Sequence, residues 1–259
     1  MTTSTTEPTN KLKNILIRTG AALFWLCVWQ LGAMAINQKI ILVSPVQVFI
    51  RLTELVPTAA FWKAICFSFL RITLGFLAAC MIGVLLAALS ARFSLIRTLT
   101  APLMSTIKAT PVASFIILVL LWVPSRNLSV VISFLMVTPI VFSNILVGIS
   151  SVDAQLLEMA QVFKVRPVRR LRYLYLPQLL PFFRSACAAG LGLCWKAGVA
   201  AEVIGLPRGS IGERLYTAKI YLDTPDLFAW TVVIILVSIA FERLFMFLLD
   251  RTVARLERV

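Results

Sequence analysis

Residues 151–178 read SVDAQLLEMAQVFKVRPVRRLRYLYLPQ, and they interrupt a chain that is otherwise very apolar. The stretch is polar, basic and rich in residues that favour helices. Asp153 is placed to cap a helix that runs to about Phe163. Pro167 is placed to begin a second short helix, which Pro177 is expected to end. Two short helices in a loop between hydrophobic segments indicate a place where another protein docks.

Each of these expected helices has an apolar side. The first carries Leu156, Ala160 and Phe163 on one side, and the second carries Leu171 and Leu174. Arginines lie mostly on the remaining sides. An apolar surface ringed by cations suits insertion into a groove of a soluble partner. It suits an interfacial helix on acidic lipid equally well, and the residues alone leave both interpretations open.

The composition indicates a membrane protein. The chain has 259 residues, of which 60% are hydrophobic and only 14% charged, and its mean hydropathy is +0.93. Because soluble domains are rarely more than about half apolar, the excess is expected to face lipid. The net charge of +14 is also typical of nucleic-acid-binding proteins. We do not favour that class, because the basic residues flank apolar segments and form no single face.

Six apolar segments have the length of about 20 residues that crosses a bilayer. Continuous runs of this length exclude the alternating strands of a membrane barrel. We therefore predict an all-α membrane protein with six transmembrane helices. Residues 1–12 are expected to form a disordered tail, and residues 13–259 a single transmembrane domain. The six segments are 15–36, 65–90, 102–123, 128–150, 179–206 and 227–249.

The distribution of lysine and arginine predicts the orientation. If the amino terminus is inside, the inner segments hold thirteen of these residues and the outer segments hold seven. Positive residues concentrate on the cytoplasmic side, so both termini and the 151–178 loop are expected there. The inner set is Lys11, Lys13, Arg18, Arg92, Arg97, Lys164, Arg166, Arg169, Arg170, Arg172, Arg251, Arg255 and Arg258, and the outer set is Lys39, Arg51, Lys63, Arg126, Arg208, Arg214 and Lys219.

Two short helices are expected in the outer loops. An S-x-x-Q box at residues 44–47 begins one of them. The other is amphipathic over residues 211–222 and lies on the outer rim, either as a structural cover or as a gate.

Three residues within the spans are candidates for a translocation pathway. Lys196 lies near the middle of the fifth span, where an ionised side chain costs roughly 2.5–3.5 kcal/mol. It is expected to face a cavity or an interface between protomers, either to attract an anionic solute or to pair with a carboxylate. Glu202 does not share a helix face with Lys196 and needs a partner from another helix or protomer. Pro111 is expected to bend the third span, and bent helices often line pathways in transporters.

No catalytic or metal-binding group is expected in this chain. It contains no histidine and no G-x4-G-K-[ST] phosphate loop. No nucleophile–base pair supports an integral membrane enzyme. Its cysteines form no C-x-x-C pair and are expected to be small core residues. They are Cys27, Cys66, Cys80, Cys187 and Cys194.

The loop at 151–178 resembles the EAA motif of ABC-importer permeases, E-A-A-x3-G-x9-I-x-L-P. The matching residues are Glu158, Ala160, Leu174 (with Leu176) and Pro177, all at the spacing of the motif. Met159 replaces an alanine, and Lys164 stands where glycine is usual. Four further stretches resemble the nitrate/sulfonate/taurine branch of the binding-protein-dependent, MetI-like (type I) permeases. They are Ser44-Pro45, Arg71-Ile72-Thr73-Leu74-Gly75-Phe76, Thr110-Pro111 and Ala200-Ala201-Glu202-Val203-Ile204-Gly205.

The resemblance implies a type I importer permease that moves a small anionic or organic solute into the cytoplasm by alternating access. It implies a homodimer in the lipid bilayer with two cytoplasmic ATPase subunits and an extracytoplasmic solute-binding protein. ATP and Mg²⁺ are expected on the ATPase subunits, and no cofactor on this chain. In the family the EAA loop forms coupling helices that bind the ATPase. This role carries over to Glu158, Ala160, Leu174 and Pro177, with apolar Phe163 and Leu171 expected beside them.

One alternative belongs to a different class of transporter. An ion-driven secondary carrier or channel needs ionisable relays within its spans. Only Glu202 and Glu242 are available there as acids. Transport that persists without ATP and collapses with an uncoupler would favour this alternative.

Overall fold

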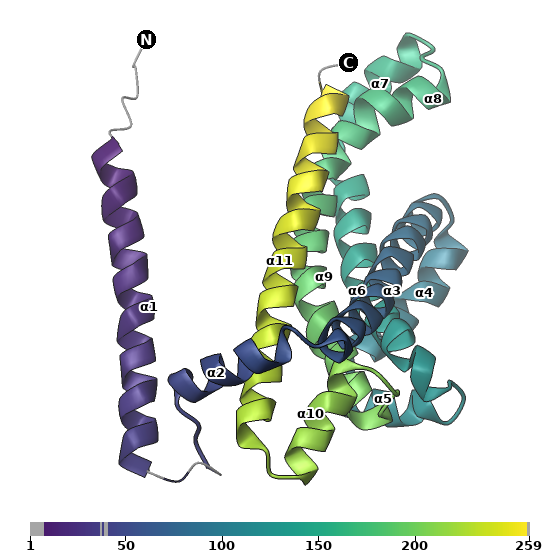
Figure 1. Ribbon diagram of the computed structural model, residues 1–259. Coiled ribbons are helices and arrows are strands. Elements are labelled where there is room, and N and C mark those ends of the chain that lie inside the picture. The colour runs from purple at the N-terminus through teal and green to yellow at the C-terminus, as the bar shows by residue number, and fades with distance from the viewer. Residues whose placement is uncertain (1–7, 37, 39–40, 258–259) are drawn as a thin grey trace.

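Every regular element among the described residues is helical (Figure 1). The computed structural model describes the backbone of residues 8–36, 38 and 41–257, and the side chains of all of these except 8–16, 18 and 254–257. The elements in order are α1 (Pro8–Ile36), α2 (Pro45–Leu55), α3 (Ala59–Arg92), α4 (Ser94–Ala109), α5 (Val112–Leu120), α6 (Ser125–Ser150), α7 (Ala154–Val162), α8 (Pro167–Arg170), the π-helical turn η1 (Leu171–Tyr175), α9 (Leu176–Gly205), α10 (Ile211–Ile220) and α11 (Thr224–Glu257).

Five helical segments are long and apolar enough to cross a membrane, and a bent pair makes a sixth if it is counted as one span. The five are α1, α3, α6, the continuous run from α8 through η1 to α9, and α11. Most of the predicted spans are therefore confirmed as membrane-length helices. The two helices expected in the outer loops, α2 and α10, are also present. Ser44 caps α2 as predicted, by accepting the Gln47 N–H, and Ser210 caps α10 by accepting the Glu213 N–H.

The third predicted span, 102–123, is not one continuous helix. It corresponds to α4 and α5, whose axes differ by 108°. The break lies at Thr110 and Pro111. Thr110 has the extended backbone (φ −79°, ψ 130°) that a following proline imposes, and Pro111 has no N–H to continue the helix. By contrast, Pro139 lies inside the unbroken helix α6.

The prediction of a disordered tail over residues 1–12 is wrong for residues 8–12. Residues 8–12 are helical, because α1 begins at Pro8, a residue that suits the first turn of a helix. Residues 1–7 lie outside the described part of the chain.

Helix α6 packs between α3 and α9, and small residues allow the close approach. A Cβ atom added to Gly75 of α3 would lie 2.4 Å from the carbonyl oxygen of Val130 in α6. A Cβ atom added to Gly198 of α9 would lie 2.7 Å from the Ser133 Oγ of α6. On the other side of α9, the ring of Phe241 in α11 lies edge-on to its neighbours and closes the core.

Short helices lie at two opposite ends of the molecule. Figure 1 shows α7 and α8 at one end, together with the beginning of α1 and the end of α11, and α5 and α10 at the opposite end. We call these the α7–α8 end and the α10 end. The arrangement agrees with the prediction that both termini share a side with the 151–178 loop. Which side of the membrane this is remains a prediction.

Helix α1 stands apart from the other helices in Figure 1. Only 6% of its membrane-length segment is buried. It meets the rest of the chain near its carboxyl end, where the ring of Trp29 lies 5.8 Å from that of Phe228 in α11.

Candidate functional site

The corner between α7 and α8 has a defined geometry. The side chain of Asp153 caps α7 by accepting the Gln155 N–H at 2.8 Å, as predicted. At the other end of α7, Lys164 has a left-handed backbone (φ 48°). Its N–H donates to the Gln161 carbonyl, and the N–H of Val165 donates to that of Ala160 at 3.0 Å. This is the Schellman pattern, in which glycine is favoured at the left-handed position.

The unusual residue in the motif is thereby explained. The family pattern has glycine where this chain has Lys164, because the turn requires a positive φ that glycine adopts without a steric penalty. The lysine makes the same turn, so the spacing of the motif is preserved.

Arg170 fixes the corner from the α8 side. Its Nη2 donates to the carbonyl of Ala160 and its Nε to that of Val165, both at 3.0 Å. Ala160 is itself almost fully buried beneath this corner. In the sequence, Arg170 is one of several cations around an apolar surface. Its position ten residues after the alanine of the motif gave no sign of the two hydrogen bonds.

Several large apolar side chains at the corner have no cover from this chain. Val162, Phe163 and Val168 are 74–77% exposed, and Met159 and Leu171 are about half exposed. We call these five residues the α7–α8 apolar surface. A concentration of exposed apolar side chains on a protein is typical of an interaction site.

The predicted coupling residues divide into two groups. Glu158, Phe163 and Leu171 are exposed, whereas Ala160 is buried and Leu174 is partly buried. The first three are thus accessible to a partner, whereas the carbonyl of the buried Ala160 accepts the hydrogen bonds that form the corner.

Pro177 differs from its prediction. It does not end the second helix, because α8 continues through η1 into α9 and Pro177 lies in the first turn of α9. In η1 the N–H of Leu176 donates to the carbonyl of Leu171, five residues earlier. A π-helical turn of this kind changes the hydrogen-bond register, and it accommodates a proline that cannot donate. The result is one continuous helical run from Pro167 to Gly205.

Near the α7–α8 end, this continuous run faces its neighbours across a cavity and, further along, is joined to α11 by an ion pair. A cavity of about 380 Å³ separates Leu171 and Tyr175 of η1 from Arg92 of α3 and Ile149 of α6. Further along, the guanidinium of Arg184 in α9 pairs with both carboxylate oxygens of Asp250 in α11, at 2.7 and 3.1 Å. Arg184 therefore has a partner and does not merely extend towards the membrane surface.

Two of the three pathway candidates are open to the surroundings of the protomer. Lys196 of α9 and Pro111 at the α4–α5 break are exposed. One turn before Lys196, a Cβ atom added to Gly192 would meet nothing within 4 Å. A further lysine was missed: Lys108 is exposed, and its Nζ donates to the Ser143 Oγ of α6 at 2.6 Å. A lone lysine two residues before Thr110-Pro111, inside an apolar segment, was the available signal.

The third candidate, Glu202, is buried within the protomer. It accepts a hydrogen bond from the Ser68 Oγ of α3 at 2.6 Å and one from the Gly212 N–H of α10 at 3.3 Å. The expectation that its partner comes from another helix is confirmed. Glu202 therefore joins α9 to α3 and α10, and it is not exposed as Lys196 and Lys108 are.

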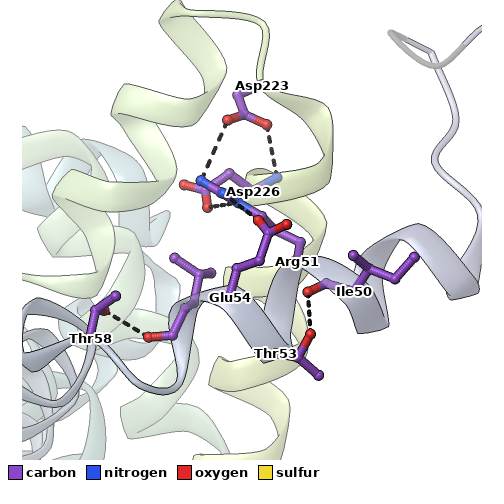
Figure 2. A network of polar contacts seen from close by, with 8 residues as sticks. Ile50, Arg51, Thr53, Glu54, Thr58, Asp223 and Asp226 are labelled. Atoms are coloured by element: carbon purple, nitrogen blue, oxygen red, sulfur yellow. Dashed lines mark hydrogen bonds and ion pairs between the residues drawn. The ribbon is translucent and has the colours of Figure 1, made fainter.

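A cluster of charges joins α2 to α11 at the α10 end (Figure 2). Arg51 donates to Glu54 at 2.9 Å and to Asp226 at 3.0 Å, and Asp223 lies 3.8 Å away. The hydrogen bond to Glu54 raises the pKa of Arg51 above its ordinary value, and that to Asp226 raises it further, while partial burial opposes them. Arg51 therefore stays charged throughout the physiological pH range.

The profile of the binding-protein-dependent transport system inner membrane component family matches residues 79–258. The chain belongs to this family. The matched region contains the whole α7–α8 corner and the helical run that leads from it to Lys196.

Individual members of the permease family are similar over most of the chain. The identity is 24% over 215 residues with the aliphatic sulfonates transport permease protein SsuC of Bacillus subtilis, covering 82% of this chain and 78% of that protein. It is also 24% over 220 residues with the taurine transport system permease protein TauC of Escherichia coli, covering 83% and 80%. The riboflavin transport system permease protein RibX of Chloroflexus aurantiacus is 28% identical over 141 residues, which is 54% of this chain and 52% of that protein.

A solved structure supports the same fold. One chain in the crystal structure of an amino acid ABC transporter with histidines superposes with a TM-score of 0.53 at 19% identity, covering 80% of this chain and 96% of that chain. The protein is therefore an all-α, multi-pass inner membrane protein and a permease component of a transport system. Such a permease component is not itself catalytic.

Proposed function

We propose that this permease is the transmembrane subunit of an ABC importer and that the α7–α8 apolar surface binds its ATPase subunit. The observation that carries the proposal is the corner itself. Phe163 and its apolar neighbours are exposed at the end of a rigid turn, within the part of the chain that the family profile matches. A soluble partner with a hydrophobic groove would bury these side chains.

The continuous helix supplies a mechanical connection. Lys196 lies 29 residues after Pro167 in one uninterrupted helical run, which corresponds to about 43 Å at 1.5 Å per residue. A partner that displaces the corner would therefore also tilt the segment that carries Lys196. Drawing two such corners together on ATP binding would alternate the access of a central pathway.

The exposed face of α9 suits a pathway between two copies of the chain. Ser185, Ala188 and Gly192 are spaced along this face on the way to Lys196, and all are small. The close approach of two such faces in a homodimer would leave the lysines beside a central space. The relatives named for sulfonate and taurine transport carry substrates with an anionic group, so we propose a small anion as the solute and Lys196 as a residue that attracts it.

The remaining partners follow from this assignment. The α7–α8 end faces the cytoplasm, where the ATPase subunits hold ATP and Mg²⁺. The α10 end faces outward and receives the solute-binding protein. The family assignment disfavours an ion-driven secondary carrier, and Glu202, one of its two candidate relay acids, accepts hydrogen bonds that join α9 to α3 and α10.

Uptake by the complete transporter in proteoliposomes tests the proposal. Phe163→Ala is expected to weaken ATPase association and to lower ATP-driven uptake at least tenfold. Gln161→Ala is the matched control, because Gln161 is exposed on the same helix but outside the apolar surface. A second test combines Glu158→Ala with Pro177→Ala. If that double variant kept both ATPase association and uptake, the coupling assignment would be wrong.

A further inference from the structure

A cavity of about 440 Å³ lies at the α10 end, where three parts of the fold meet. It is bounded by α3, by the first residues of α6 and by the loop between α9 and α10. Its lining residues are Phe67, Ser125, Arg126, Leu206, Pro207 and Arg208. The volume lies within the range of small-molecule sites in proteins.

The charges at this cavity are of one sign. Arg126 and Arg208 line it and are exposed, and no acidic residue is among its lining residues. Arg71 adds a third guanidinium, because its Nε donates to the carbonyl of Arg126 and its Cζ lies 3.9 Å from the ring centroid of Phe67. In contrast to Arg51 and Arg184, none of these three has a carboxylate ion pair among the described residues.

Two carboxylates lie on elements close to this cavity, and both accept hydrogen bonds elsewhere. Glu202 acts electrostatically on Arg71, but it is buried and accepts hydrogen bonds from Ser68 and the Gly212 N–H. Glu213 accepts the N–H of Gly209, beside Arg208. Neither of these carboxylates lines the cavity, and neither forms an ion pair with its arginines among the described residues.

The loop that carries Arg208 is held in a fixed shape. Leu206 caps α9 with a left-handed backbone, φ 50°, and Gly209 has φ 80°. Pro207 between them is buried. On the opposite wall, Ser125 is the first residue of the 26-residue helix α6, whose amino-terminal dipole also favours an anion. A site with its cations and its helix dipole already in place loses little freedom when a ligand enters.

We propose that this cavity, which we call the outer arginine pocket, binds the oxyanion group of a small solute before the solute reaches the membrane pathway. The proposal rests on the proposed function, since it assumes that the α10 end faces outward. Gly205, at the end of α9 beside the pocket, is nine residues from Lys196, or about 14 Å along the helix. An anion released from the pocket would then have a second cation, Lys196, within this distance along α9.

The test measures the electrostatic potential at the outer arginine pocket and needs no ATPase subunit. Ser125→Cys is introduced into the full chain in nanodiscs, with Cys27→Ser and Cys66→Ser to remove the exposed native thiols. The thiol is then labelled with 2-sulfonatoethyl methanethiosulfonate, which is a sulfonate, and with the trimethylammonium reagent of similar size. We expect the ratio of the anionic to the cationic labelling rate to fall about tenfold when Arg126→Gln and Arg208→Gln are combined.

Arg214→Gln is the matched control, because Arg214 is exposed on α10 but does not line the pocket. It is expected to leave the ratio unchanged. Ethanesulfonate, added as a free probe, should slow the labelling in a saturable way when both arginines are present. An unchanged ratio in the double variant, or protection by phosphatidylglycerol in the nanodisc but not by ethanesulfonate, would overturn the proposal. Saturable protection in a chain that fails to associate with an ATPase would keep the pocket and reject the importer role.

Discussion

Ser68 of α3 donates a hydrogen bond to the carboxylate of Glu202 in α9 at 2.6 Å, across 134 residues of sequence. The same Ser68 Oγ accepts the N–H of Ile211, the first residue of α10, at 3.0 Å. One hydroxyl group thus joins three helices at the α10 end. Since these groups are buried away from water, each hydrogen bond that is lost leaves an uncompensated polar atom.

Ser68→Ala is expected to destabilise the protein by about 1–3 kcal/mol, because it removes one hydrogen bond from Glu202 and one acceptor from the Ile211 N–H. The measurement is unfolding of the purified chain in mixed micelles, followed by tryptophan fluorescence. Ser185→Ala, an exposed position on α9, serves as the control and should change the stability little. Equal effects of the two variants would show that the Ser68 hydroxyl does not join the helices.

Gly212→Ala should be more damaging than Gly192→Ala. A Cβ atom at Gly212 would lie 2.4 Å from the backbone carbon of Glu202, so α10 would have to move away from α9. At Gly192 the same atom meets nothing within 4 Å. We expect Gly212→Ala to lower the thermal midpoint and Gly192→Ala to leave it unchanged. In the complete transporter Gly192→Ala should nevertheless reduce uptake, because that face is proposed to meet the second protomer.

Lys164→Gly should stabilise the α7–α8 corner by about 1 kcal/mol, since glycine adopts the left-handed backbone of this turn without the cost that a side chain brings. Lys164→Val should have the opposite effect. Resistance of the 151–178 segment to limited proteolysis measures both changes. If the valine variant were as resistant as the glycine variant, the left-handed turn would not be the conformation in the membrane.

Asp226→Asn should separate α2 from α11 more than Glu54→Gln does. The Asp226 side chain is 15% exposed and bridges two helices, whereas Glu54 is 57% exposed and pairs with Arg51 three residues earlier on the same helix. We expect the free energy of unfolding to fall by about 1–2 kcal/mol in Asp226→Asn and by less than about 0.5 kcal/mol in Glu54→Gln.

The pH dependence of the Arg51 cluster has a definite sign. Because the pKa of Arg51 is raised, its contribution to stability is complete below the ordinary pKa of arginine and is lost only as the pH rises through the raised value. Between neutral pH values, the thermal midpoint of the native chain should therefore change by no more than that of the Arg51→Gln variant.

Much of the fold could be predicted because hydrophobic length determines membrane helices. The predicted spans at 65–90, 128–150 and 227–249 lie within α3, α6 and α11. The prolines were harder to interpret. Pro111 breaks its span and Pro139 does not, because the outcome depends on which neighbouring helices support the backbone.

The candidate site could be predicted only in part. Helix periodicity, which is a local property, identified Phe163 and Leu171 as apolar residues of the corner. It also put Ala160 on the same side as Phe163, but Ala160 is buried and Phe163 is exposed. The hydrogen bonds of Arg170 to the corner and of Ser68 to Glu202 depend on the folded arrangement, so no local pattern indicated them. The continuity of η1 into α9 was missed for a similar reason, since a proline after two short helical turns normally suggests an end.

Photo-crosslinking at the corner tests the central claim most directly. The benzophenone amino acid p-benzoylphenylalanine is placed at Phe163, 74% exposed at the α7–α8 end, or at Tyr221, 79% exposed at the α10 end, in the full chain in its native membrane. After irradiation, mass spectrometry identifies the adducts. The account predicts an adduct with a subunit that carries a G-x4-G-K-[ST] phosphate loop from position 163 and none from position 221. Adducts from position 163 with lipid alone, or an ATPase adduct from position 221, would contradict it.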